Sequence, residues 1–348
     1  GRVITEKQNI EGEGLLEFYY TYSSVGQLET KSYKNGPVVK NMYDAYGNPV
    51  NIMVDTQPIW ELNADTGMLV SMLCGGTHTT TSTLNNKGYL ANLKTVKGNT
   101  IVHNMDFVFD GTTGNLTSRE GMISQKETFL YDNLDRLTGA KHGTSAAVEQ
   151  SISYLSNGNI SSKTGLGTYE YHPAKKHAMT GVDNTDNLLS TNEQTITYTA
   201  FNKAGCLKDK VGSDNYQLDI HYGTDQQRWK TVLKKNNTVV RTAIFAGDYE
   251  KITNSGITQH LYYISGGNGL AAIYVKQSGQ SDKIYYPNTD HQGSIVSMTD
   301  GSGSTVFKAH YDAWGKQTIT NNTFKFYRGY TGHEHLPEFS LINMNGRM

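Results

Sequence analysis

The feature that most constrains the fold is a short aromatic, turn and glycine unit that returns about every 21 residues. Its clearest copies are Tyr43–Gly47, which reads YDAYG, and Tyr311–Gly315, which reads YDAWG. Asp suits the start of a tight turn because its side chain can accept a hydrogen bond from the backbone two residues on. Gly suits the end, where a left-handed backbone closes a bulged hairpin. Each unit therefore predicts a strand, a tight turn and a second strand.

The unit recurs along almost the whole chain. The copies that begin at Tyr22, Tyr43, Leu62, Leu84, Phe109, Tyr131 and Tyr154 are separated by 21, 19, 22, 25, 22 and 23 residues. Such a period is typical of repeat proteins, in which each unit buries its surface against its neighbours. We take the following residues as structural anchors of the repeat: Tyr22, Gly26, Tyr43, Asp44, Gly47, Gly67, Gly88, Phe109, Gly114, Tyr131, Tyr154, Gly158, Phe201, Gly205, Tyr222, Tyr311, Asp312 and Gly315.

The segments between the turns have the length and pattern of strands. Residues 16–22 (LEFYYTY) and 194–199 (QTITYT) alternate in a way that places one set of side chains on each face of a sheet. No window shows a sustained apolar period of 3.6 residues, so we expect helices to be few and short. The sequence predicts an all-β fold of tandem hairpins, stacked edge to edge in an antiparallel sheet.

Composition excludes several classes of function. The net charge of −1 gives no electrostatic basis for binding nucleic acid or an anionic membrane. No run approaches the 18 or more apolar residues of a membrane-spanning helix. The first residues lack the apolar core of a signal peptide and begin in the middle of the repeat pattern, so we expect an internal segment of a longer polypeptide. We predict no cofactor.

Two phrases near the end of the chain resemble the RHS repeat-associated core domain, and the upstream units resemble YD repeats. The first phrase, residues 290–300, reads DHQGSIVSMTD, with Gln292 where Leu is common in the family. The second, residues 329–348, reads GYTGHEHLPEFSLINMNGRM. The core-motif residues that carry the resemblance are Asp290, His291, Gly293, Thr331, Gly332, His333, Glu334 and Arg347.

This resemblance implies a continuous β-ribbon that spirals into a hollow shell. In bacterial polymorphic toxins and in the C component of insecticidal toxin complexes, such a shell encloses a toxic C-terminal segment. In teneurins, a similar barrel belongs to a cell-adhesion ectodomain. We therefore expect a YD-repeat region over residues 1–260 and an RHS core region over residues 261–348. The core region is continuous with the repeat sheet and stops before the family's Y-D-P segment.

The resemblance also implies the partners and the location. We expect a C-terminal toxin or cargo segment of the parent polypeptide, together with secretion or delivery machinery, and a secreted or cell-surface location. The main hypothesis is a non-enzymatic shell segment that encloses and helps to deliver that cargo. The first alternative is a cell-surface adhesion module or a glycan-binding module of YD repeats, in which exposed tyrosine rings would stack on sugars. The second alternative is an autoproteolytic or metal-dependent enzyme.

The residues give little support to the hypothesis of an enzymatic function. The family's autoprotease uses aspartates that follow Y-D-P, beyond Met348, so we expect no self-cleavage and no catalytic residue. Asp290, Asp300 and Asp312 could form paired carboxylates, but turn chemistry already explains each of them. Paired carboxylates would also need one raised and one lowered pKa, which a sequence does not reveal.

The triplet His333-Glu334-His335 is a weak candidate for a metal site. On a strand, His333 and His335 would share a face, with His310 or His291 as a further ligand. A third ligand at a recognisable spacing is missing, however, so we expect a hydrogen-bonded turn rather than a bound metal.

Overall fold

The repeated units fold into two long antiparallel sheets. A computed structural model describes residues 1–10, 12–121, 126–143, 147–189 and 194–345. Within these residues, the first sheet has 17 strands. They are β1 (Thr5–Ile10), β2 (Gly14–Tyr22), β3 (Leu28–Tyr33), β4 (Val38–Tyr43), β5 (Pro49–Val54), β6 (Gln57–Asp65), β7 (Leu69–Cys74), β8 (His78–Leu84), β9 (Leu90–Lys97), β10 (Thr100–Phe109), β11 (Leu116–Gly121), β12 (Glu127–Tyr131), β13 (Leu137–His142), β14 (Gln150–Tyr154), β15 (Ile160–Lys163), β16 (Gly167–Tyr171) and β17 (Met179–Val182).

The second sheet has 12 strands in the same described part of the chain. They are β18 (Thr195–Tyr198), β19 (Ala204–Val211), β20 (Asp214–Tyr222), β21 (Arg228–Lys235), β22 (Thr238–Ala246), β23 (Tyr249–Asn254), β24 (Ile257–Gly266), β25 (Gly269–Gln277), β26 (Lys283–Thr289), β27 (Ile295–Asp300), β28 (Thr305–Tyr311) and β29 (Gln317–Asn322). A short C-terminal segment follows, with 3₁₀ turns η1 (Tyr330–Gly332) and η2 (Pro337–Phe339) and the small strands β30 (Glu334–Leu336) and β31 (Leu341–Asn343). The predicted boundary at residue 260 falls inside β24.

Each strand pairs with its neighbour in sequence, so the hairpin is the building unit. Tyr43 lies opposite Pro49 and Tyr311 opposite Gln317, and in β4–β5 the register shifts immediately before the tyrosine. Similar shifts precede Tyr22, Tyr131, Tyr154 and Tyr222. Such bulges sharpen the right-handed twist of a hairpin. The predicted all-β fold of tandem hairpins in curved antiparallel sheets is confirmed.

The turn chemistry explains why each hairpin reverses where it does. Asp44 Oδ1 accepts hydrogen bonds from the backbone N–H groups of Tyr46 (2.8 Å) and Asn48 (2.9 Å), while Gly47 takes a φ of +91°. The same arrangement closes the turn at Asp312, where Gly315 has a φ of +83°. Positive φ is the conformation that L side chains resist and glycine accepts. These two glycines are therefore required by the backbone.

The anchor Gly205 occupies a different place from the one expected. It lies within β19 and does not close a turn. Asn202, with a φ of +61°, takes the left-handed position, and the turn runs from Thr199 to Lys203. Asn tolerates this conformation better than other non-glycine residues because its short polar side chain bonds locally. The turn therefore ends before Gly205 is reached.

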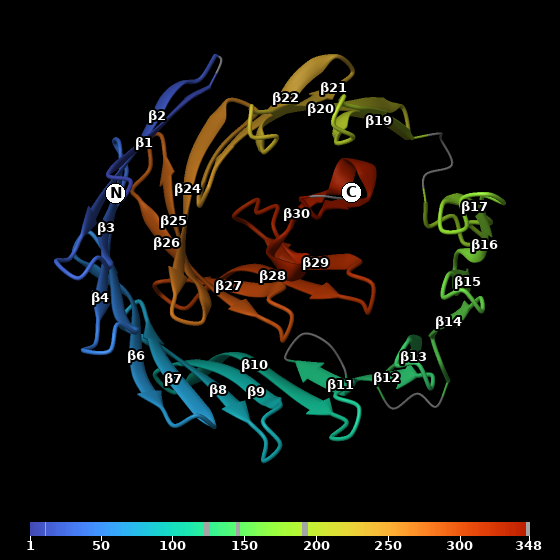
Figure 1. Ribbon diagram of the computed structural model, residues 1–348, viewed down its shortest axis with the longest axis horizontal. Helices are drawn as coiled ribbons and strands as arrows, with labels where there is room; N and C mark the ends of the chain where they lie inside the picture. Colours follow the sequence, from blue (N-terminus) through green and yellow to red (C-terminus); the bar gives the residue numbers. More distant parts are fainter. Residues whose placement is uncertain (11, 122–125, 144–146, 190–193, 346–348) are drawn as a thin grey trace.

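The two sheets form one spiral ribbon. Figure 1 shows the first sheet curving around the outside from β1 to β17, and the second sheet returning across the top and then passing inside the first. β24–β26 lie inside the outer strands β3–β6, and β27–β29 lie near the centre. The N-terminus lies on the outer turn and the C-terminus inside the ring (Figure 1). The core of the molecule is therefore the layer between two turns of the same ribbon.

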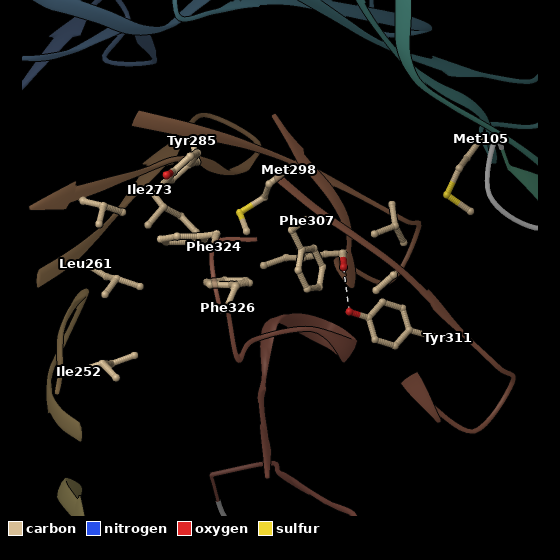
Figure 2. Packing of buried hydrophobic residues seen from close by; sticks show 14 of the residues in the cluster. Met105, Ile252, Leu261, Ile273, Tyr285, Met298, Phe307, Tyr311, Phe324 and Phe326 are labelled. Atoms are coloured by element: carbon tan, nitrogen blue, oxygen red, sulfur yellow. Dashed lines mark hydrogen bonds between the residues drawn. The ribbon is translucent and has the colours of Figure 1, made fainter. Parts of the chain in front are cut away.

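Apolar side chains fill this layer. Figure 2 shows Met298, Phe307 and Tyr311 on inner strands, with Met105 approaching from the outer sheet. The rings of Phe307 and Phe326 pack edge to face, with centroids 5.6 Å apart. Full burial of one such side chain contributes roughly 1.5–3 kcal/mol. A second cluster joins the outer residues Phe18, Tyr33, Val54, Ile59 and Trp60 to the inner residues Tyr249, Tyr262, Ile264 and Ala272.

Candidate functional site

The first core phrase forms a buried turn between β26 and β27. Asp290 is only 3% exposed, and its Oδ1 accepts hydrogen bonds from the backbone N–H groups of Gln292 and Ser294, both at 2.9 Å. Gly293 takes the left-handed position with a φ of +81°. His291 lies against the Phe107 ring of the outer turn, 5.2 Å between ring centroids. Burial lowers the pKa of His291.

The second core phrase docks onto this turn. Thr331 N–H donates to Ser294 Oγ at 3.1 Å, and Ile295 N–H donates to the Gly329 carbonyl at 3.0 Å. Thr331 itself has a φ of +47°, just before Gly332 at +71°. The two phrases, almost 40 residues apart in sequence, therefore form one structural unit, which we call the core junction. Arg347 lies outside the described residues.

Ion pairs fix the C-terminal segment to the inner strands. Glu334 pairs with Arg228 of β21, and Arg328 pairs with Glu250 of β23. The Arg241 guanidinium meets both carboxylate oxygens of Glu338, at 3.0 and 3.3 Å. Bidentate pairs of this kind are strong and geometrically specific. Apolar contacts add to these ion pairs, because Leu336 and Phe339 pack into a third apolar cluster with residues of β19–β21.

The two histidines that the sequence marked as weak metal candidates make local contacts. His335 Nε2 accepts a hydrogen bond from Tyr330 N–H at 3.0 Å, and His333 Nδ1 lies 2.8 Å from Thr331 Oγ1. Burial lowers the pKa of His335 to about 4, so its ring is neutral at pH 7. Three metal-ligating groups do come together elsewhere among the described residues, at Glu127, His142 and His310.

Arg119 connects the core junction to the outer turn, and the sequence reasoning missed it. Its Nε lies 2.5 Å from Glu127 Oε2, its Nη1 lies 3.8 Å from Asp290 Oδ2, and its Nη2 donates to the Tyr311 carbonyl. Arg119 is 5% exposed and Glu127 is fully buried. The sequence did contain one indication that this carboxylate is buried, because strand alternation places Glu127 on the same face as the buried Phe129.

The carboxylates that could have formed an acid–base pair are engaged in turns. Asp300 accepts from the N–H groups of Ser302 and Ser304, as Asp290 and Asp312 do in their own turns. Hydrogen bonds from Ser302 and Ser304 lower the pKa of Asp300 against the opposing effect of partial burial. This arrangement favours a structural role for the three carboxylates.

A cavity of about 650 Å³ lies between the two turns beside the core junction. Its lining includes Trp60, Cys74, His103 and Asp290. Burial raises the pKa of Cys74 to about 11, so the thiol stays protonated at neutral pH. A protonated thiol is a poor nucleophile and a poor metal ligand. The cavity therefore offers space and polar edges, with no activated nucleophile among the described residues that line it.

The tyrosines that the glycan hypothesis invoked fall into two groups. Most repeat tyrosines are at least partly buried, and their hydroxyls donate to backbone carbonyls, as Tyr131 does to Leu116 at 2.9 Å. Tyr46 and Tyr198 are 92% and 66% exposed. Glycan binding through exposed rings stays a prediction.

Comparison with known proteins identifies a matching family and two related curated proteins. A model of the family described as teneurin YD-shell matches residues 67–348. The tRNA3(Ser)-specific nuclease WapA of Bacillus spizizenii is 26% identical over 254 residues, which cover 66% of this chain and 9% of that protein. The tRNA nuclease WapA of Bacillus subtilis is 25% identical over the same length, again covering 9% of it. The chain thus spans a small part of these curated relatives.

Solved structures share the fold at low sequence identity. The crystal structure of TcdB2-TccC3 superposes with a TM-score of 0.78 at 13% identity, covering 99% of this chain and 22% of that one. The Photorhabdus luminescens Tc holotoxin pore gives 0.75 at 13% identity, covering 98% and 21%. No helix in the described part of this chain is long and apolar enough to cross a membrane.

Proposed function

The chain belongs to the teneurin YD-shell family, as the resemblance predicted, and we propose that it is a non-enzymatic shell segment of an RHS-type toxin. Its role would be to enclose a C-terminal cargo segment of the parent polypeptide and to aid its delivery. The parent would be secreted or lie at the cell surface, with secretion or delivery machinery as a further partner.

One observation carries this proposal: the ribbon winds inward and its C-terminal end lies inside the ring (Figure 1). A segment that continued from there would start on the enclosed side of a wall in which the strands of each sheet are hydrogen-bonded to their neighbours. A paired wall resists local opening, because opening must break several ladder hydrogen bonds together. The direction in which the ribbon coils therefore supports a role in containment.

The core junction supports the same role. Thr331 and Ser294, Glu334 and Arg228, and Glu338 and Arg241 hold the last described residues to the inner strands. A cargo joined beyond this point would be anchored close to the shell wall. The tRNA cleavage named for the two WapA proteins is not proposed for this chain, because a net charge of −1 gives no basis for attracting nucleic acid.

A protease-protection experiment tests the proposal. The same small protease-sensitive domain is fused after Met348 in one protein and before Gly1 in another, with the shell unchanged. We expect cleavage of the C-terminal passenger to be at least ten times slower, because its linker starts inside the ring. The N-terminal fusion is the matched control. Equal cleavage rates at the two ends, with the shell intact, would rule out containment by this segment.

A further inference from the structure

A cluster of three metal-ligating side chains joins the two turns of the ribbon. Glu127 on β12 and His142 on β13 lie directly opposite each other in the outer sheet. His310 on β28 reaches them from the inner turn, since its Nε2 lies 3.8 Å from Glu127 Oε1. The three residues therefore come from two neighbouring outer strands and one inner strand.

The distances suit one small cation. Glu127 Oε1 lies 3.2 Å from His142 Nε2 and 3.8 Å from His310 Nε2, and the three ligand atoms all lie within 4.8 Å of one another. In a tetrahedral zinc site with bonds of about 2.0–2.2 Å, neighbouring ligand atoms are roughly 3.3–3.5 Å apart. The Glu127–His142 distance is already close to this value, and the His310 ring would have to move toward the other two ligands to reach it.

The Glu127 carboxylate is incompletely satisfied by the protein. Its side chain is fully buried; Oε2 is bound by Arg119, but Oε1 accepts no hydrogen bond from any described residue. An unsatisfied charged oxygen in the interior is costly, and native structures rarely leave one without a reason. This orphaned oxygen faces both imidazole rings, which is where a cation would lie.

The second carboxylate, Glu149, orients the His142 ring. Glu149 Oε2 lies 2.8 Å from His142 Nδ1, so Nδ1–H donates to it and the lone pair of a neutral ring sits on Nε2. That lone pair then faces the Glu127 Oε1 lone pairs across 3.2 Å, which is repulsive unless a positive charge lies between them. Metal-binding histidines commonly show this outer carboxylate.

We propose that Glu127, His142 and His310 bind one Zn²⁺ ion that links the inner turn of the ribbon to the outer turn. Two imidazoles and one carboxylate are a ligand set that zinc favours, with water in the fourth position. The local charges agree: Glu127 and Asp290 outweigh Arg119, and Glu149 adds a further negative charge nearby. Burial also lowers the pKa of His310, which keeps its ring in the neutral form that binds metal.

Zinc binding to the intact chain provides the direct test. Metal-free protein is titrated with Zn²⁺ by calorimetry, and the stoichiometry is checked by elemental analysis after dialysis. We expect one ion per chain and a rise of roughly 4 °C in the unfolding temperature at a hundred-fold excess over Kd. Co²⁺ in place of zinc should give the visible absorption of a four-coordinate site.

Variants separate this site from adventitious binding. His142→Gln and His310→Gln should each abolish stoichiometric binding and the thermal shift, while Glu149→Gln should weaken binding about ten-fold. His221→Gln on β20 is the matched control, because His221 is an exposed strand histidine far from the cluster in sequence. Absence of zinc uptake by the wild-type chain would overturn the proposal. Unchanged uptake by both histidine variants would overturn it equally.

Discussion

At the scale of single residues, the repeat tyrosines connect one hairpin to the previous one. The hydroxyls of Tyr43, Tyr154 and Tyr311 donate to the carbonyls of Leu28, Leu137 and Ile295, at 3.0, 2.7 and 2.8 Å. Leu28 and Leu137 lie opposite Tyr22 and Tyr131, the repeat tyrosines of the preceding hairpins, and Ile295 lies opposite Thr289. Tyr suits this position because its rigid ring carries a hydroxyl donor far enough from the backbone to reach the neighbouring strand.

Replacing the tyrosine by Phe should cost most where the acceptor is buried. Tyr311 is 1% exposed and its hydroxyl also accepts from Gln317, so Tyr311→Phe should lower the free energy of unfolding by about 1–3 kcal/mol. Tyr43 is only half-buried, so Tyr43→Phe should cost about 0.5–1 kcal/mol. Urea denaturation measures both, with Tyr46→Phe as the exposed control. Equal losses for Tyr311 and Tyr43 would contradict the role of burial.

At the scale of the element, many hairpins, including β14–β15 and β28–β29, close with a left-handed glycine, but the surroundings of these glycines differ. A Cβ at Gly158 would meet no atom within 4 Å, whereas a Cβ at Gly315 would lie 2.9 Å from the Tyr330 ring. Both positions have a φ near +85°. Gly158 is therefore constrained by its backbone conformation alone, whereas Gly315 is also constrained by the C-terminal segment.

Two alanine substitutions distinguish these constraints. Gly158→Ala should lower the free energy of unfolding by about 1–2 kcal/mol, the cost of a left-handed L residue. Gly315→Ala should cost about 1–3 kcal/mol more, because the added methyl displaces Tyr330. Thermal or urea unfolding gives the difference. If Gly315→Ala lowered the free energy of unfolding no more than Gly158→Ala does, the contact between this turn and the C-terminal segment would not contribute to stability.

At the scale of the whole molecule, stability depends on how the inner turn packs against the outer one. Neutral buried histidines lie at these contacts. His103 on outer β10 and Thr289 on inner β26 line the same cavity between the turns, and His335 accepts from Tyr330 N–H in the core junction. Burial lowers the pKa of each ring to about 4. Charging either ring would place a poorly solvated cation between the turns.

Acid should therefore loosen the spiral. In the unfolded chain each histidine takes up a proton near pH 6.5, whereas in the folded chain it does so only near pH 4. The unfolded state thus binds more protons in this window, and stability is lost as the pH falls from about 6.5 to about 4, by up to about 3 kcal/mol for each ring.

Urea midpoints measured across that range, with a chelator present, provide the check. His103→Gln and His335→Gln should each flatten the pH dependence, while the exposed control His221→Gln should leave it unchanged. A wild-type curve that is flat between pH 6.5 and pH 4 would show that these rings contribute nothing to the pH dependence.

The sequence by itself determined the local architecture. The period of about 21 residues, the Asp and Gly of each turn, and the alternation of the strands predicted tandem hairpins and an all-β fold. Turn chemistry and strand alternation act over a few residues, so they can be read without the rest of the chain. Gly205 and Asn202 show where such local prediction fails. Both residues suit the left-handed conformation, and the strand register places Asn202, not Gly205, at that position of the turn.

Only the tertiary structure decided which residues meet between the turns. Alternation places Glu127 on the face of Phe129, but it does not say that an inner strand carrying His310 covers that face. His142 and His310 are 168 positions apart, and Arg119 and Asp290 are 171 apart. Their approach depends on the accumulated twist of many hairpins, a quantity that no single repeat encodes. The contacts within a hairpin are therefore local properties of the sequence, while the buried charges and the proposed metal site arise from the coiling of the ribbon.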